Sequence, residues 1–276
     1  MTLATLAEVL EPARKDGYAV AGLVCLGWED MRAYAQAAEA EGLPVILQAG
    51  PSCRKHTPLP VLGAMFRNLA ESVSVPVVAH LDHGYTVDEC QAALEAGFTS
   101  LMFDGSRLPL EENIRATRAI AKMAHDAGIS CEGEIGFVGY AEGAASEGTD
   151  PDEAARFAAE TGVDAMAVSV GNVHLQERQV GGLDEARIAR IEAVTDVPLV
   201  IHGGSGVPAE QRRRLARDTA ICKFNIGTEL RQVFGAELRA VLAADNDAFD
   251  RVALLSQLEA PLRDAARGVL RGFVAD

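Results

Sequence analysis

Short apolar runs recur along the chain, separated by stretches in which apolar residues recur at helical spacing, as at Ala33, Ala37 and Ala38. Runs of this length, bounded by turn residues, are typical of strands buried on both faces of a parallel sheet. Eight strands are expected, at Tyr18–Leu26, Pro44–Gln48, Val77–Leu81, Ser100–Asp104, Ser130–Glu134, Ala165–Val170, Leu199–His202 and Ile221–Asn225. Eight strand–helix units predict an α/β protein with one (β/α)8 TIM-barrel domain over residues 1–276.

The alternative architecture is a doubly wound open sheet. No Gly-x-Gly-x-x-Gly motif follows the first apolar run, so nothing in the sequence supports a dinucleotide-binding fold of that kind. The chain has 276 residues, 49% of them hydrophobic, which is enough for one large core. The barrel is therefore the preferred prediction.

Three segments outside the expected strands have patterns of their own. Apolar positions from Leu3 to Leu10 predict a first amphipathic helix. The stretch from about Glu229 onward, with Leu230 and Val233 at helical spacing, predicts a C-terminal helical extension that closes the barrel or forms an oligomer surface. Gly139–Asp152 is rich in glycine and acidic residues and predicts a mobile loop, which is an active-site lid or a disordered segment without function.

Composition narrows the classes of partner and compartment. The chain carries 25 Lys and Arg against 40 Asp and Glu, for a net charge of −15. This excess argues against nucleic acid and anionic membranes as partners, but not against an anionic small molecule. The five cysteines form no Cys-x-x-Cys pair, and neither a membrane span nor a signal peptide is recognisable. We expect a soluble, cytoplasmic protein.

Three histidines mark the ends of separate apolar runs. His83, His174 and His202 each follow such a run, and the carboxyl ends of barrel strands meet on one face. A lone histidine in this position is more often a hydrogen-bonded structural residue. Three neutral imidazoles with one open position, however, are typical of a catalytic zinc site.

Acidic residues accompany these histidines. Asp82 is adjacent to His83 and, on an extended strand, is expected to point the other way, which favours proton transfer over metal binding. Asp104 makes an Asx turn, orients a ligand imidazole, or holds a second cation. Glu132 and Glu134 share one strand face, where they require a cation or a proton unless they face solvent.

Two glycine-rich segments follow the last two expected strands. Gly203-Gly204-Ser205-Gly206 and Asn225-Ile226-Gly227-Thr228 both lead into expected helices. Backbone N–H groups at helix N-termini attract anions, and the last two loops of a barrel often bind phosphate. The pair predicts a phosphate site.

Together these motifs resemble the class II, zinc-dependent fructose-bisphosphate and tagatose-bisphosphate aldolase family. The matching segments are Tyr18-Ala19-Val20, His80-Leu81-Asp82-His83, Asp104-Gly105-Ser106, Glu132-Gly133-Glu134-Ile135-Gly136, His202-Gly203-Gly204-Ser205-Gly206-Val207-Pro208 and Lys223-Phe224-Asn225-Ile226-Gly227-Thr228-Glu229. Their order and approximate spacing follow the family from residue 1 to about 235. The resemblance implies a TIM barrel, a Zn²⁺ cofactor, a monovalent cation (Na⁺ or K⁺), and a homodimer or homotetramer.

The resemblance also implies a role for each matching residue. His83, His174 and His202 match the zinc ligands, which Glu134 can join in the resting state, and Asp104 and Glu132 match positions that support the ligands or hold a second cation. Asp82 matches the acid/base for the hydroxyl of the aldehyde fragment, and Glu142, in the loop, matches the group that moves the proton at the nucleophilic carbon. Asn225 matches the residue that holds the ketose backbone, and Gly203, Ser205, Gly227 and Thr228 match the phosphate cradle.

Several positions depart from the family pattern. The usual His-Gly-x-Tyr-Lys reads His174-Leu175-Gln176-Glu177-Arg178, so the lysine is missing or moved to Arg178. Val24, Gly50 and Tyr140 replace an asparagine, a serine or threonine, and a glycine, respectively. These changes favour a substrate other than the glycolytic one.

The resulting prediction is a zinc-dependent aldolase that reversibly cleaves a ketose mono- or bisphosphate to dihydroxyacetone phosphate and an aldehyde through a metal-stabilised enediolate. The alternatives are an aldolase for another polyhydroxy ketone or sugar phosphate, a metal-dependent epimerase or decarboxylase, and a non-catalytic sugar-phosphate-binding protein.

Overall fold

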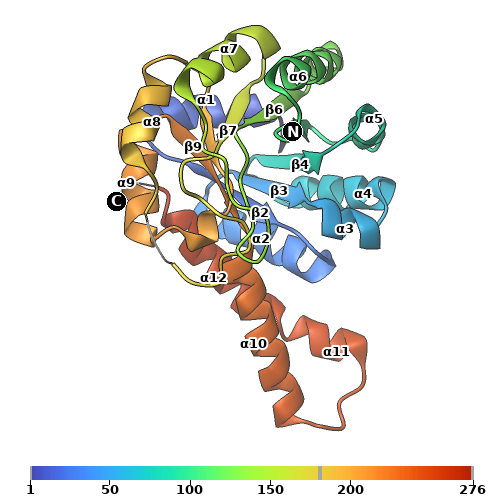
Figure 1. Ribbon diagram of the computed structural model, residues 1–276. Helices are drawn as coiled ribbons and strands as arrows, with labels where there is room; N and C mark the ends of the chain where they lie inside the picture. The colour runs from blue at the N-terminus through green and yellow to red at the C-terminus, as the bar shows by residue number, and fades with distance from the viewer. Residues whose placement is uncertain (1, 180–181, 275–276) are drawn as a thin grey trace.

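Eight parallel strands close into a barrel surrounded by helices in the computed structural model, which describes residues 2–179 and 182–274 (Figure 1). The barrel strands are β2 (Val20–Val24), β3 (Val45–Ala49), β4 (Val77–Gly84), β5 (Ser100–Phe103), β6 (Ser130–Ile135), β7 (Ala165–Val168), β8 (Leu199–Ile201) and β9 (Ile221–Ile226). Each strand pairs with its neighbour in sequence, and β9 pairs with β2 to close the ring. The TIM-barrel prediction is confirmed, and the open sheet is excluded.

The helices follow the order expected for strand–helix units. They are α1 (Leu6–Asp16), α2 (Trp28–Glu41), α3 (Pro51–His56), α4 (Leu59–Glu71), α5 (Val87–Glu95), α6 (Leu110–Asp126), α7 (Pro151–Thr161), α8 (Glu185–Glu192), α9 (Ala209–Asp218), α10 (Thr228–Ala244), α11 (Arg251–Ser256) and α12 (Glu259–Arg271), with a short 3₁₀ turn, η1 (Gly204–Gly206). The predicted loop Gly139–Asp152 ends sooner than expected, because α7 begins at Pro151. An isolated antiparallel bridge joins Glu147 in this loop to Phe137, just before it.

The first residues of the chain close one end of the barrel. The predicted first helix starts later than expected, because Leu3–Ala4 forms a short strand, β1, that pairs with Val77 and Val78 of β4. Thr5 then caps α1 through a capping box with Glu8. The buried face of α1 packs with inward-facing residues of the strands, including Val20, Ile46 and Val78. This apolar packing leaves the opposite, carboxyl end of the barrel for polar residues.

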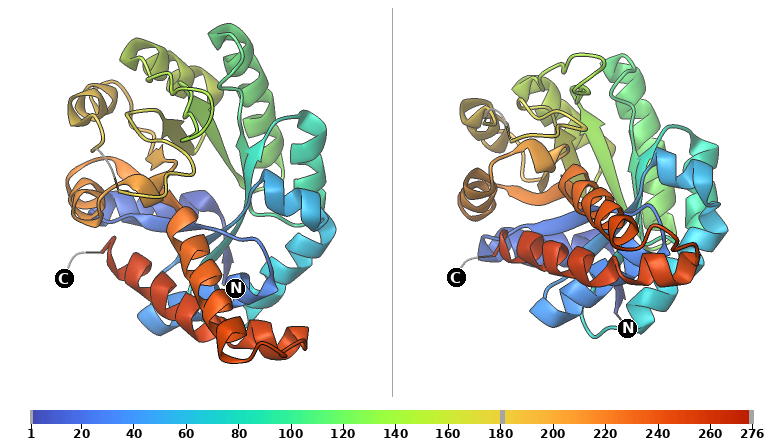
Figure 2. Two further views of the ribbon diagram at one scale, coloured as in Figure 1. Left: turned by 60° about the horizontal axis from the view of Figure 1, so that its bottom comes forward. Right: turned by 90° about the horizontal axis from the view of Figure 1, so that it is seen from below.

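The C-terminal extension forms three helices. In Figure 1, α10 and α11 project from the barrel as an arm, and in Figure 2 α12 runs back beside α2, against which it packs. None of the helices in residues 2–179 and 182–274 is long and apolar enough to span a membrane.

A close helix–helix contact generates a stability prediction. A Cβ atom at Gly63 in α4 would lie 2.0 Å from the carbonyl oxygen of Ala96, which caps α5. Gly63→Ala should therefore lower the free energy of unfolding by about 1–3 kcal/mol, because backbone has to shift. Urea denaturation measures this change.

Gly268 in α12 is the matched control, since a Cβ atom there meets nothing within 4 Å. Gly268→Ala should raise the free energy of unfolding by roughly 0.4–1 kcal/mol through the lower entropy of the unfolded chain. Equal effects of the two substitutions would contradict the close contact at Ala96.

Candidate active site

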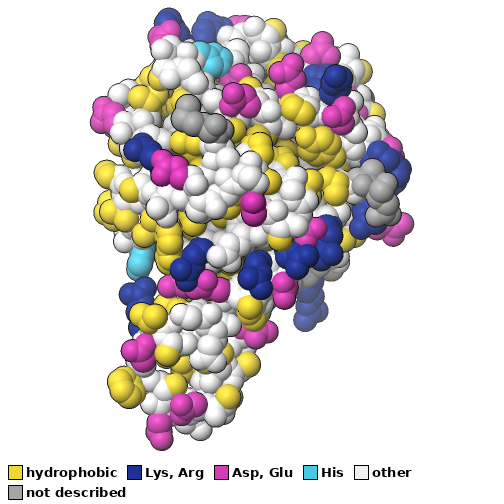
Figure 3. All heavy atoms as spheres, turned by 180° about the vertical axis from the view of Figure 1, so that it is seen from behind, with side chains coloured by type: hydrophobic (Ala, Val, Ile, Leu, Met, Phe, Trp, Pro, Cys, Tyr) yellow, Lys and Arg dark blue, Asp and Glu magenta, His cyan; other side chains and the backbone are white. Residues whose placement is uncertain are grey.

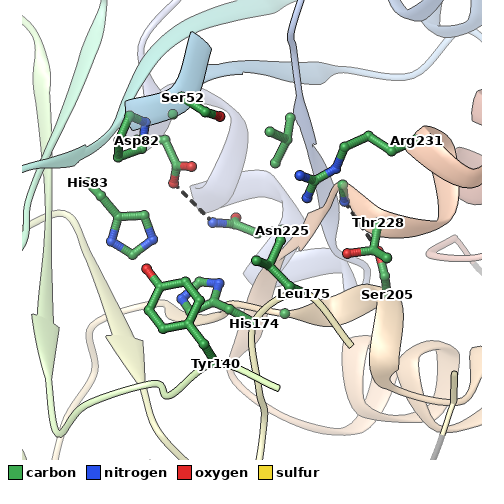
Figure 4. Close-up of a pocket in the computed structure, with 15 residues that line it drawn as sticks. Ser52, Asp82, His83, Tyr140, His174, Leu175, Ser205, Asn225, Thr228 and Arg231 are labelled. Carbon is green, nitrogen blue, oxygen red and sulfur yellow. Dashed lines mark hydrogen bonds between the residues drawn. The ribbon is translucent and has the colours of Figure 1, made fainter. Parts of the chain in front are cut away.

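A pocket of about 340 Å³ opens at the carboxyl ends of the barrel strands (Figure 4). It brings together most of the residues singled out in the sequence. Its lining comprises Val24, Gly50, Pro51, Ser52, Asp82, His83, Tyr140, His174, Leu175, Gly203, Ser205, Asn225, Gly227, Thr228 and Arg231. The fully buried His202 lies beneath this lining, against His83 and His174.

The three histidines converge on one point. Their ring centroids are separated by 4.7 Å for His83 and His202, 5.1 Å for His83 and His174, and 5.4 Å for His174 and His202. One ring nitrogen from each lies within 4.8 Å of the others. This spacing suits a single metal ion bound by three imidazoles.

Carboxylates orient two of these rings from behind. Nδ1 of His83 lies 2.8 Å from Oδ2 of Asp104, and Nε2 of His202 lies 3.1 Å from Oε1 of Glu132. An ionised carboxylate accepts a hydrogen bond from the N–H of the nearer ring nitrogen, so the other nitrogen keeps its lone pair for a cation. Asp104 also accepts hydrogen bonds from the backbone N–H and the hydroxyl of Ser106, so it forms the Asx turn as well.

Two buried polar atoms at the centre have no hydrogen-bond partner among the described residues. They are Nδ1 of His202 and Oε2 of Glu134, which lie 3.4 Å apart. Burial, reinforced by the nearby charge of Asp104, raises the pKa of Glu134 to about 8. Unpaired buried polar atoms are costly, and a cation between them would satisfy both. The donor set of three imidazoles and a carboxylate therefore fits a divalent metal such as Zn²⁺.

Asp82 and His83 both line the pocket, so the expectation that they face opposite sides was wrong. His83 adopts a φ of 55°, and the pairing of β4 with β5 shifts register between Leu81 and Gly84. The strand is therefore not regularly extended at this point, and alternation no longer applies.

The side chain of Arg54 supports this irregular backbone. It donates to the carbonyl oxygens of Asp82, at 2.6 Å, and His83, at 3.0 Å, and forms an ion pair with Glu89. No sequence motif singles out Arg54, because its partners are defined only by folding.

The Asp82 carboxylate remains ionised in this setting. Burial acts to raise the pKa of Asp82, but the nearby His83, His202 and Lys223 outweigh it and hold the pKa below its ordinary value. Oδ1 accepts a hydrogen bond of 3.3 Å from the Asn225 amide (Figure 4). Asp82 is thus a carboxylate able to accept a proton beside the candidate metal position.

Lys223 is the second residue that the sequence left without a role. Its ammonium group is fully buried inside the barrel, 2.6 Å from Oε2 of Glu132 and 3.3 Å from Nε2 of His80. Burial, followed by the charge of Lys223, lowers the pKa of His80 to about 3, so His80 is neutral. A lysine between two apolar residues of an expected buried strand was the available signal for a buried ion pair.

The residues expected to bind phosphate lie at one side of the same pocket. The Ser205 hydroxyl accepts hydrogen bonds from the backbone N–H groups of Gly227, at 3.2 Å, and Glu229, at 3.3 Å. Gly203 has a φ of 64°, and a Cβ atom there would lie 2.1 Å from the carbonyl oxygen of Val173. Only glycine fits this turn without a shift of the backbone.

The structure does not bring Glu142 into the pocket. Glu142 is exposed and lines a separate hollow with Gln176, Glu177 and Arg178. The loop that carries it is attached to His174, because the N–H of Ala141 donates to the carbonyl of His174 and the Tyr140 ring stacks on the imidazole at 4.9 Å. Tyr140 and Leu175 separate the hollow from the pocket and line both.

The buried ion pair generates a prediction. Lys223→Met should lower the free energy of unfolding by about 3–5 kcal/mol, because Glu132 keeps its charge without a counter-ion. Addition of Glu132→Gln should recover part of this loss. Lys122→Met, which breaks an exposed pair with Asp126, is the control and should leave the urea midpoint unchanged. A Lys223→Met protein as stable as the control would refute this account of the barrel interior.

Comparisons with known proteins agree with this geometry. Residues 4–275 match the family described as fructose-bisphosphate aldolase class-II. The chain is 37% identical over 265 residues to a 6-phospho-5-dehydro-2-deoxy-D-gluconate aldolase from Shouchella clausii, with 93% of this chain and 89% of the relative covered. It is 36% identical over 279 residues to a fructose-bisphosphate aldolase from Geobacillus stearothermophilus, with coverages of 99% and 96%. The crystal structure of the YdjI aldolase from Escherichia coli K12 superimposes with a TM-score of 0.86 at 30% identity, covering 99% of this chain and 98% of that one. The chain therefore belongs to the class II fructose-bisphosphate aldolase family.

Proposed function

We propose that this aldolase is zinc-dependent and reversibly cleaves a phosphorylated ketose to dihydroxyacetone phosphate and an aldehyde. One observation carries the proposal: three imidazoles converge beside an ionised Asp82 in a pocket that also contains the glycine-rich turns after β8 and β9. His83, His174 and His202, joined by Glu134, would hold the metal. Asp104 and Glu132 would orient its ligands.

The chemistry divides between the metal and the side chains. A bound Zn²⁺ would supply a Lewis acid for the substrate carbonyl and for the negative charge that cleavage leaves on the keto fragment. Asp82 accepts the proton of the hydroxyl on the carbon that becomes the aldehyde, and the C–C bond to the keto fragment breaks. Asn225, which donates to Asp82, holds the ketose backbone. Glu142 returns a proton to the nucleophilic carbon once its loop turns toward the pocket.

Pocket side chains that differ from the family pattern favour a substrate other than fructose 1,6-bisphosphate. Val24 and Leu175 present apolar groups to the pocket, Gly50 presents none, and Tyr140 covers the His174 ring. Fewer hydroxyl contacts are therefore available than in the family pattern. The relatives carry names for two different sugar-phosphate substrates, so the substrate differs among proteins similar to this chain. An aldolase acting on another sugar phosphate or polyhydroxy ketone fits best.

The proposal also includes a second cation near the substrate phosphate. A monovalent cation, Na⁺ or K⁺, would support the phosphate cradle of Gly203, Ser205, Gly227 and Thr228.

Figure 3 shows hydrophobic side chains on the projecting arm of α10 and α11, where Phe249 is 91% and Val252 74% exposed. A second copy of the chain would cover them in a homodimer or homotetramer. The five free, buried cysteines suit the reducing cytoplasm.

The aldolase reaction predicts metal-dependent cleavage of at least one member of a panel of ketose mono- and bisphosphates. The protein is assayed with added Zn²⁺ and with a chelator, and released aldehyde and dihydroxyacetone phosphate are quantified. If neither cleavage nor exchange of the carbon-bound hydrogens of any substrate occurs under either condition, the proposal is refuted. Proton exchange or epimer formation without cleavage would favour the epimerase or decarboxylase alternative.

The metal and proton-transfer roles separate in two variants. His174→Ala should lose bound zinc, measured by elemental analysis, together with activity. Asp82→Asn should keep a full complement of zinc and lose turnover by about 10²–10⁴-fold, because it removes only the proton acceptor. Full zinc occupancy in His174→Ala would contradict the ligand assignment, and normal turnover of Asp82→Asn would contradict the role of the carboxylate.

A further inference from the structure

Arg231, the fourth residue of α10, reaches the candidate active site from the side opposite His83 and His174 (Figure 4). Asn225 lies between the two ends in this view. Among the described residues that line the pocket, Arg231 is the one lysine or arginine. The pocket therefore has a metal-binding end and a separate cationic end.

The Arg231 guanidinium has no counter-ion among the described residues. No hydrogen bond or ion pair joins it to another side chain in the described part of the chain, where its buried Nε atom also has no partner. Burial lowers the pKa of Arg231, opposed in part by the nearby Tyr34 hydroxyl. A partly buried cation without a partner is unfavourable, and an anionic ligand would supply the missing charge and acceptors.

Neighbouring residues keep the guanidinium unpaired. Val24 packs beside Gly227 at the N-terminus of α10 and offers no hydrogen-bond acceptor. A Cβ atom at Gly227 would lie 3.0 Å from Nη2 of Arg231, so glycine leaves this space open. The Glu229 carboxylate, on the first turn of the same helix, is already paired with Arg212.

Two hydroxyl groups complete a set of donors around this space. The Ser205 hydroxyl accepts two backbone N–H groups, so its own hydrogen remains free to donate. The Thr228 hydroxyl has no hydrogen-bond partner among the described residues. These two hydroxyls and the Arg231 guanidinium lie near one another on the same side of the pocket (Figure 4). Such a group of donors suits a phosphate monoester, which has three strong acceptor oxygens, better than a carboxylate with two.

We propose that Arg231 binds the phosphate monoester on the keto fragment of the substrate. This contact would place the substrate carbonyl at the metal-binding end of the pocket. The inference rests on the proposed aldolase function and adds to it the residue that binds the phosphate. Arg178, the sequence candidate for the missing lysine, lies exposed in the separate hollow with Glu142. The positive charge in the pocket thus comes from α10 and not from the segment after His174.

The test compares dihydroxyacetone phosphate with dihydroxyacetone as probes of the zinc-loaded protein. Deuterium exchange from solvent into the carbon-bound hydrogens is followed by proton NMR over a range of concentrations. Arg231→Gln should raise the half-saturating concentration of dihydroxyacetone phosphate at least tenfold and leave exchange into dihydroxyacetone unchanged. Arg231→Lys should have a half-saturating concentration of dihydroxyacetone phosphate between those of wild type and Arg231→Gln, because the lysine ammonium is a point charge and cannot make the bidentate hydrogen bonds of a guanidinium.

A matched control and a direct binding measurement accompany the exchange assay. Arg239→Gln removes an exposed arginine farther along α10 and should leave both probes unaffected. Circular dichroism and thermal unfolding establish that each variant is folded. Calorimetric titration with inorganic phosphate should show binding to wild type and Arg239→Gln and loss of at least tenfold in affinity in Arg231→Gln.

The outcomes separate this inference from the proposed function. If wild type exchanges dihydroxyacetone phosphate and Arg231→Gln has the same half-saturating concentration within twofold, Arg231 does not bind the phosphate. An equal loss for dihydroxyacetone would show a general structural effect and also overturn the inference. If wild type neither exchanges nor cleaves, the aldolase proposal fails, and the phosphate titration alone decides: equal binding by wild type and Arg231→Gln overturns the anion site.

Discussion

The ion pair between Lys223 and Glu132 is the interaction on which the active site depends. Both side chains are fully buried in the barrel, so neither charge is stable without the other. Burial acts to raise the pKa of Glu132, but Lys223 and the hydrogen bond from His202 hold it well below its ordinary value. Glu132 therefore stays ionised and fixes the orientation of His202. The pair connects the interior of the barrel to the candidate metal ligands.

The barrel can hold these charges because its two ends differ. At one end α1 packs with inward-facing apolar residues and excludes water. Toward the other end Lys223, Glu132, His202 and Asp82 form a polar layer, and above it the pocket opens. Apolar packing stabilises the barrel, while the polar layer costs free energy unless every member has a partner. The unpaired atoms of Glu134 and His202 are where a cation would complete that layer.

One side of the pocket carries a positive charge, from Arg231, although the net charge of the protein is −15. His83 and His174 line the metal end with Asp82, and Lys223 lies deeper in the barrel, paired with Glu132. Carboxylates near the metal position and a guanidinium at the far side suit a substrate with a polarisable carbonyl and a distant anionic group. An acidic protein can thus bind an anionic sugar derivative, because Arg231 lines the pocket, whereas exposed charges farther away are screened by salt.

The fold was predictable because its signals are local. Short apolar runs and helical spacing identified all eight barrel strands, and parallel barrel topology then placed the strand-end residues on one face, including His83, His174 and His202. The glycine-rich turns after β8 and β9 were also visible, since backbone N–H groups at a helix start need no distant partner. Even β1 was hidden only because two residues carry too little pattern to distinguish a strand from a helix start.

What the sequence alone determined is therefore the barrel and the set of reactive groups that share its open end. Tertiary structure decided how these groups are paired and aimed. Lys223 and Glu132 are 91 positions apart, and the turn at His83 is held by Arg54 from another element. The unpaired state of Arg231 and the placement of Glu142 outside the pocket likewise depend on neighbours from distant segments. Periodicity reports which face of an element is buried, but a side chain's partner depends on which elements come together in space.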